Sequence, residues 1–224
     1  MRIEQLDILE TVDRVAGKIA SGRLPSFAEV HVVKALEEIG VQETVGRMRL
    51  SKDLHFGEGV VRTLVKHLKN EGLIEVSKSG ISLSATGRRL LSRLRELMSK
   101  QIDVPPTSLT VGTFNVAVRV RRMKSRVKYG LEQRDAAIVA GAKGATTLVF
   151  TENKLVMPGT EEDVSKSDPS IYATLSKLDL NEADVVIIGS ADEKIGAELG
   201  AKAAALELLK SRNKNDSRSA LVCS

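Results

Sequence analysis

The sequence predicts an α+β protein with two domains, a helical N-terminal domain with one short hairpin and a small C-terminal α/β sandwich. Three observations support this prediction. Apolar residues recur at helical spacing up to about residue 97, and they alternate as in a strand from residue 114 onward. The pair Pro105-Pro106 separates the two regions. The length of 224 residues also suits two modest domains better than one.

These changes along the chain place the domain boundaries. We expect the N-terminal domain, with an extra first helix, at residues 1–100 and a linker at 101–108, where the two prolines favour an extended connection. The α/β domain should span 109–210. Residues 211–224 are polar and are expected to form a flexible tail.

Composition limits the class of protein. Hydrophobic residues make up 42% of the chain, but aromatic residues only 3%, so aliphatic side chains must fill the cores. Cys223 is the single cysteine, which excludes an intrachain disulfide and suits a reducing compartment. No apolar run approaches the roughly 18 residues of a spanning helix, and no signal pattern opens the chain. We therefore expect a cytoplasmic protein without a membrane partner.

Charge is distributed unevenly along the chain. Residues 41–100 hold 12 Lys and Arg against 6 Asp and Glu, a net charge of +6. Residues 101–130 hold 6 against 1 (+5), whereas residues 131–210 hold 8 against 14 (−6). Nucleic acid is the obvious polyanionic partner for the basic region, and a merely solvated surface is the alternative.

Two helices are expected before residue 41. Met1 to Ala20 carries apolar residues at amphipathic spacing, and Ser26 to Glu29 reads as a capping box that opens a second helix ending at Gly40. The first helix is either a dimerisation element or an extra helix packed on the same domain.

The stretch from Leu50 to Asn70 predicts two helices joined by a tight turn at Phe56-Gly57. The second helix, from Glu58, divides by face. Its apolar stripe consists of Val60, Val61, Leu64, Val65 and Leu68. Its opposite face consists of Glu58, Gly59, Arg62, Thr63, Lys66, His67 and Asn70.

A hairpin and a further helix follow. Gly72 stands where a helix C-cap favours a left-handed residue. Residues 74–76 and 81–83 alternate as two strands around a turn at 78–80, and 84–97 has leucines at helical spacing.

Residues 46–97 resemble the winged helix-turn-helix DNA-binding domains of prokaryotic transcriptional regulators. The resemblance rests on Leu50-Ser-x-x-Leu54, on Val61-Arg62 with Leu64 and Leu68, on Gly72-Leu-Ile74, and on Leu83-x-x-Thr86-x-Arg88. It implies double-stranded DNA as a partner, read in the major groove by the helix from Glu58.

Candidate DNA contacts follow from the exposed faces. Arg62, Thr63 and Lys66 are candidates for base edges, because Arg and Lys commonly read guanine. Glu58 is expected to stabilise the N-terminal end of the helix, although it could instead accept a hydrogen bond from cytosine. The phosphate candidates are Arg47, Arg49, Ser51, Lys52 and Lys78. An ordinary solvated helix face is the alternative.

The second half predicts the order β-α-β-β-α-β-α, for which a ferredoxin-like topology is one candidate. The strands are expected at 114–121, 145–150, 155–157 and 184–189, and the helices at 131–142, 168–178 and 192–210. The first strand alternates apolar and polar residues, which predicts a half-buried strand with a basic end. Asp168-Pro169 predicts an N-cap followed by proline at the first helical position.

The whole chain is similar to an archaeal family of uncharacterised winged-helix proteins with a C-terminal α/β domain. This resemblance rests on residues 130–138, 144–149 and 184–192 and on Leu199-Gly-Ala201. It implies a regulator and gives no effector.

Two stretches are candidates for binding an anionic effector. Arg119 and Arg121 begin a basic run that could instead contact phosphates or form a solvated strand end. Gly189 and Ser190 precede a helix whose free amides could hold an anion, although Ser190-x-x-Glu193 is also a capping box.

No nucleophile-base arrangement, metal-ligand spacing or complete nucleotide-binding motif is present, so we expect neither an enzyme nor a cofactor. The favoured hypothesis is a homodimeric DNA-binding transcriptional regulator whose second domain senses a small molecule or mediates assembly. One alternative is a nucleotide- or anion-binding protein or enzyme whose winged helix serves localisation. Another is a winged helix that binds RNA or protein.

Overall fold

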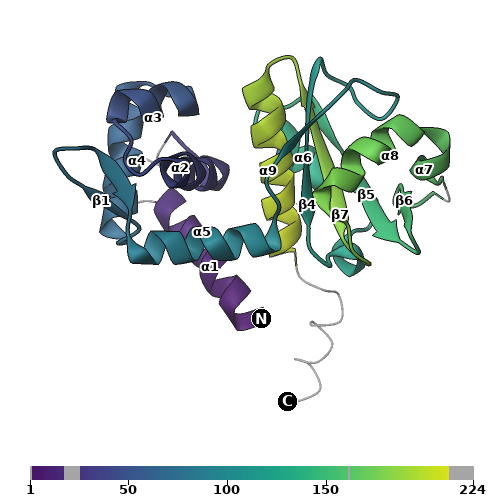
Figure 1. Cartoon of the computed structure of the whole chain (residues 1–224), viewed down its shortest axis with the longest axis horizontal. Helices are drawn as coiled ribbons and strands as arrows, with labels where there is room; N and C mark the ends of the chain where they lie inside the picture. Colours follow the sequence, from purple (N-terminus) through teal and green to yellow (C-terminus); the bar gives the residue numbers. More distant parts are fainter. Residues whose placement is uncertain (1, 18–25, 161, 212–224) are drawn as a thin grey trace. The chain divides into compact units, whose positions relative to one another are not determined.

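The computed structural model describes residues 2–17, 26–160 and 162–211, and the chain divides into two compact units, residues 1–96 and 97–224 (Figure 1). The mixed helix and sheet content confirms the predicted α+β class. Most of the predicted tail, residues 212–224, lies outside the described residues, as does the end of the first predicted helix. No described helix is both long enough and apolar enough to cross a membrane.

The first unit is a helical domain with a two-stranded hairpin. Its core is aliphatic, with Leu36, Leu50, Leu64 and Leu68 fully buried. Its elements are α1 (Arg2–Ala16), α2 (Glu29–Val41), α3 (Arg47–Leu54), α4 (Glu58–Asn70), β1 (Ile74–Val76), β2 (Ile81–Leu83) and α5 (Ala85–Leu97). The predicted helix 58–70 and both hairpin strands are confirmed.

Helix α1 packs within the first unit against α2 and α4. Val12 and Val15 are buried, and the Val15 carbonyl oxygen lies 2.7 Å from Nδ1 of His67. Arg14 Nε donates to Glu71 at 3.2 Å. The structure therefore supports the interpretation of α1 as an extra helix on the same domain.

The predicted capping box at Ser26 is wrong. Helix α2 begins at Glu29 after an extended Ala28, whose N–H donates to Nδ1 of His31 at 3.0 Å, while Ser26 is exposed. The residue between them explains the delay, because Phe27 is buried with its ring edge-on to His67 at a centroid distance of 5.4 Å. An extended chain carries Phe27 into the core before the helix starts.

Gly72 ends α4 in a left-handed conformation, as predicted, with φ of +66°. The Leu73 N–H donates to Leu68 O at 2.9 Å and the Gly72 N–H to Lys69 O at 3.0 Å, which is the Schellman pattern. A Cβ at Gly72 would meet no atom within 4 Å, so conformation alone opposes a side chain there.

We expect Gly72→Ala to lower the free energy of unfolding by about 1 kcal/mol, because alanine disfavours left-handed backbone. Gly59→Ala is the matched control in the same helix, since Gly59 also has open space but ordinary helical backbone. It should stabilise the protein by roughly 0.5 kcal/mol. Urea unfolding of both variants checks this, and changes of the same sign would contradict it.

The second unit is a five-stranded antiparallel sheet with helices on both faces (Figure 1). The strand order is β3-β4-β7-β5-β6. The strands are β3 (Ile102–Val104), β4 (Phe114–Val120), β5 (Gly144–Thr151), β6 (Lys154–Val156) and β7 (Val185–Ala191). The helices are α6 (Leu131–Val139), α7 (Val164–Ser167), α8 (Pro169–Leu175) and α9 (Lys194–Lys210), with the 3-10 turns η1 (Lys124–Arg126) and η2 (Ser176–Leu178).

From β4 onward the predicted order β-α-β-β-α-β-α is found with one addition, the short helix α7 before α8, but the ferredoxin-like topology is wrong. In that topology the third strand lies between the first two. Here the last strand does: β7 pairs with β4 through Val116↔Gly189 and with β5 through Ala145↔Gly189.

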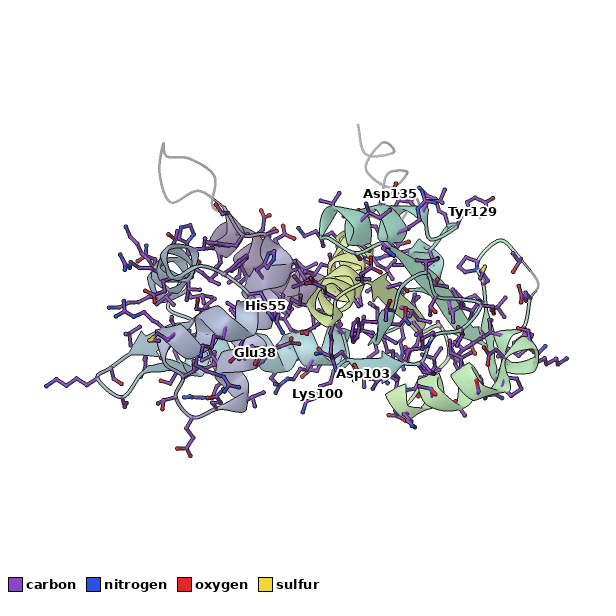
Figure 2. The ribbon with its side chains drawn as sticks, turned by 90° about the horizontal axis from the view of Figure 1, so that it is seen from above. Glu38, His55, Lys100, Asp103, Tyr129 and Asp135 are labelled. Carbon is purple, nitrogen blue, oxygen red and sulfur yellow. The ribbon has the colours of Figure 1, made fainter. Side chains whose placement is uncertain are left out.

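Two further sequence predictions need correction. The expected linker at 101–108 contains β3, which pairs with β4 through Asp103↔Val116. Asp103, labelled in Figure 2, also pairs with Lys194 at the start of α9, whose Nζ lies 2.6 Å from its carboxylate. Strand β4 is buried on both faces from Asn115 to Val120, not half-buried, because α6 and α9 cover one face and α7 and α8 the other.

The predicted helix start at Asp168-Pro169 is confirmed. The Asp168 carboxylate accepts from the Ser170 hydroxyl at 2.7 Å and from the Ile171 N–H at 3.1 Å. The Ser170 hydrogen bond, with help from the Ile171 amide, lowers the pKa of this carboxyl. Asp163 caps α7 in the same way through the Ser165 N–H, so both carboxylates have structural roles.

Candidate nucleic-acid interface

The turn between α3 and α4 is fixed by hydrogen bonds and a ring contact. His55, labelled in Figure 2, ends α3 in a left-handed conformation with φ of +54°. The Phe56 N–H donates to Ser51 O at 3.0 Å, and the Ser51 hydroxyl donates to Phe56 O. The Phe56 ring lies 4.7 Å from the ring of His31, and burial lowers the pKa of His31, which favours its neutral form. This turn holds α4 in place relative to α3.

Helix α4 presents a polar face opposite its buried stripe. Val61, Leu64, Val65 and Leu68 are buried, as predicted. Glu58, Arg62, Thr63 and Lys66 are all exposed on the other side. The prediction fails at His67, which is only 5% exposed because its ring fills the space beside Phe27 and α1.

Two adjoining hollows lie along this face, and the same two arginines, Arg47 and Arg62, line both. The first, of about 250 Å³, is lined by Arg47, Met48, Glu58, Val61 and Arg62. The second, of about 360 Å³, lies between α4 and the hairpin and is lined by Arg47, Arg62, Val65, Val76, Ser77, Lys78, Gly80 and Ile81. We call the two together the α4 groove.

The α4 groove gathers cations from three separate elements. Arg47 comes from the start of α3, Arg62 from α4 and Lys78 from the hairpin turn, and all three side chains are exposed. A concave surface with three cations is suited to a polyanionic backbone. The sequence predicted these residues individually, but their meeting in one groove depends on the fold.

Sequence reasoning missed the apolar part of the groove. Met48 is 68% exposed and Val76 is 46% exposed. Both stand in short elements whose few positions give no clear periodicity, so no pattern singled them out. Their exposure beside arginines offers an apolar surface to deoxyribose or to a thymine methyl group.

Within the described part of the chain, some of the remaining predicted contact residues already form intramolecular hydrogen bonds, and others do not. Arg49 Nε donates to both carboxylate oxygens of Asp53 at 2.9 Å, and the half-buried Ser51 is engaged in the turn. Thr63 Oγ1 donates to Gly59 O at 3.1 Å. Lys52 and Lys66 are exposed. Arg49 and Ser51 therefore have structural roles already, whereas both lysines are accessible.

Three of the four effector candidates are buried in the second unit. Arg119 donates through Nη1 to Asp179 O, and its Nε lies 3.8 Å from Asp184. Ser190 is 1% exposed. The prediction that the strand ends at Gly189 and that Ser190 leads into the helix is wrong, because β7 continues to Ala191 and α9 begins only at Lys194.

Close packing explains the glycine at position 189. A Cβ there would lie 2.4 Å from the Ala197 carbonyl oxygen and 2.5 Å from the Ala201 nitrogen, so glycine allows α9 to approach the sheet. Arg119, Gly189 and Ser190 thus offer no open surface to an effector. Arg121 is exposed. Among the described residues, no group of three or more His, Cys, Asp or Glu side chains is placed so that it could hold a metal ion.

The two units match different protein families. Residues 32–98 match the family described as the CggR N-terminal DNA binding domain. The N-terminal unit is similar to a CggR-type DNA-binding domain over these residues. The predicted resemblance to winged-helix regulators is therefore confirmed. Residues 111–208, within the second unit, match a domain of unknown function (DUF4443).

Individual relatives agree with this assignment. The chain is 31% identical over 106 residues to the central glycolytic genes regulator of Bacillus subtilis (strain 168), covering 47% of this chain and 26% of that protein. It is 35% identical over 65 residues to the regulator of the same name from Priestia megaterium (strain DSM 319 / IMG 1521), covering 29% and 19%. The chain thus spans about a quarter or less of these relatives.

A solved structure extends the similarity beyond residues 32–98. A hypothetical protein from Pyrococcus horikoshii OT3 has a TM-score of 0.64 and 27% sequence identity. The match covers 84% of this chain and 97% of that chain. It is therefore similar to this chain in both units.

Proposed function

We propose that this protein is a transcriptional regulator that binds duplex DNA with α4 and the hairpin of its CggR-type domain. The observation that carries the proposal is the α4 groove, where Arg47, Arg62 and Lys78 meet beside the exposed face of α4. The similarity to a DNA-binding domain and to two regulators supports it. The same matches favour a role other than catalysis.

Within this proposal the contacts divide by position. Arg62, Thr63 and Lys66 lie on the exposed face of α4 and are assigned to base edges. Arg47, Lys52 and Lys78 are assigned to backbone phosphates, which fix the register of the protein on DNA. Arg49 and Ser51 are assigned to supporting roles, because intramolecular hydrogen bonds already engage their side chains.

We further propose that the protein acts as a homodimer and that its second unit senses a small molecule or mediates assembly. One winged helix covers little DNA, and DNA-binding proteins commonly increase the contact area by binding as dimers to paired half-sites. Of the four predicted effector residues, only Arg121 remains a candidate for contacting a soluble anion, because it alone is exposed.

Selection from a random-sequence duplex pool at moderate salt tests the proposed function. The full chain should enrich a defined motif, and a paired inverted motif would support the dimer. The triple variant Arg47→Ala/Arg62→Ala/Lys78→Ala is the control and should enrich nothing. Salt-sensitive binding without enrichment would overturn sequence reading and leave an electrostatic anchor. Absence of binding would overturn the function itself.

A further inference from the structure

Glu58 is a carboxylate placed among the cations of the α4 groove. It is the first residue of α4, it is exposed, and it lines the first hollow together with Arg47 and Arg62. Within the described part of the chain, neither a hydrogen bond nor an ion pair joins its carboxylate to another side chain. Glu58 is therefore available to a bound molecule.

A carboxylate at this position opposes non-specific binding to DNA. The groove suits a polyanion, and each added negative charge weakens the attraction to phosphates. Stabilisation of the helix start gives one reason for an acidic residue, since a carboxylate favours the N-terminal end of the helix dipole. That reason does not require the side chain to line the groove beside two arginines.

A second reason follows from base chemistry. In the major groove the cytosine amino group is a hydrogen-bond donor, and a carboxylate is an acceptor that can pair with it. A base that offers only an acceptor at that place would repel the carboxylate. The same carboxylate can therefore raise the affinity for a site with one base and lower the affinity for sites with other bases. Specificity is commonly achieved in this way.

Arg62 lies one helical turn after Glu58 on the same face. This spacing lets the two side chains address neighbouring base pairs, with the guanidinium as donor and the carboxylate as acceptor. The sequence suggested a capping role for Glu58; its place in the groove beside Arg62 adds a reading role.

We propose that Glu58 is a specificity-determining residue that accepts a hydrogen bond from a cytosine amino group in the major groove. This inference rests on the proposed function, because it requires α4 to face the bases. It goes further by assigning discrimination to a carboxylate that contributes nothing to overall attraction.

The experiment compares wild type with Glu58→Gln and Glu58→Ala on the selected duplex, on each of its single-base variants and on random duplex. Glu10→Gln is the matched control, because it makes the same change of charge at an exposed position of α1. At one position of the motif, wild type should prefer cytosine by about tenfold. Both Glu58 variants should lose this preference, and Glu58→Gln should tolerate adenine there.

Affinity for random duplex should rise about two- to fivefold in both Glu58 variants, since a repulsive charge is removed. Glu10→Gln should leave the cytosine preference intact. If the Glu58 variants change affinity for the motif and for all its variants by one common factor, the inference is wrong and Glu58 serves only the helix start. If wild type binds no duplex at all, the proposed function fails first, which is a distinct result.

Discussion

Replacing Arg62 with alanine is expected to lower affinity for the selected duplex by about tenfold to a hundredfold, with a smaller loss for random duplex. Arg62 is the side chain of α4 that lines both hollows of the α4 groove. A guanidinium on the exposed face of a recognition helix can pair with guanine through two hydrogen bonds. The loss should therefore depend on the base sequence.

Lys78→Ala gives the contrasting result. Lys78 lies in the hairpin turn and not on α4, and it is assigned to a phosphate. Its removal should weaken binding to all duplexes by a similar factor and reduce the salt dependence by about one counterion. Competition binding with specific and random duplexes at several salt concentrations measures both effects.

Arg49→Ala is the matched control for Arg62→Ala. It removes the same side chain from the neighbouring helix α3, but this arginine is engaged with Asp53. We expect a loss of affinity of less than about fivefold, because the Arg49 guanidinium is already paired with Asp53. Losing this pair should also leave the fold intact, since an exposed ion pair contributes little to stability. Equal, sequence-independent losses for Arg62→Ala and Lys78→Ala would contradict the division between base and phosphate contacts.

The sequence predicted the first unit well because its signals are local. The apolar stripe of α4 has strict helical spacing, Gly72 supplies the left-handed residue that ends the helix, and the hairpin alternates on both sides of a glycine turn. His67 is the exception, because it was predicted to be exposed and is buried. A polar residue at the edge of a stripe looks exposed until α1 and Phe27 are known to cover it.

The second unit was predicted less well because its errors concern long-range pairing. Nothing local indicates that β7 inserts between β4 and β5, or that α9 approaches so closely that Gly189 needs to be glycine. Burial on both faces then gives polar residues such as Asn115 and Arg119 an interior position. In a sequence, such residues look like the solvent side of a half-buried strand.

The α4 groove shows the same division between local and long-range information. Exposed basic residues were predicted one by one from helix faces and turn positions. The angle between α3 and α4 decides that Arg47 and Arg62 line both hollows. It also decides that Glu58 lines the first hollow with them. A single sequence does not specify this angle.

Asp184→Ala is expected to lower the free energy of unfolding of the second unit by about 3–5 kcal/mol. Asp184 is fully buried. Its two carboxylate oxygens accept separate backbone hydrogen bonds, from the Arg122 N–H at 2.9 Å and from the Asn181 N–H at 3.0 Å. The nearby guanidinium of Arg119, itself 8% exposed, has its Nε 3.8 Å from Oδ2.

The size of this effect follows from what the alanine would leave behind. Two amide donors would lose their acceptor, and a buried arginine would lose its nearest buried negative charge. Replacing one partner of such a group costs far more than the group contributes as a whole, because desolvated polar atoms remain unpaired.

Asp179→Asn provides the control. The Asp179 carboxylate lies 4.0 Å from Arg119 Nη1, but its side chain is 95% exposed. Asparagine also suits the left-handed backbone at this position, where φ is +55°. Removing this charge should cost less than about 1 kcal/mol. Denaturant unfolding, with hydrogen exchange of β4 and β7 to isolate the second unit, compares the two variants. Similar small losses for both would show that Asp184 does not hold Arg119 and the 179–184 turn in place.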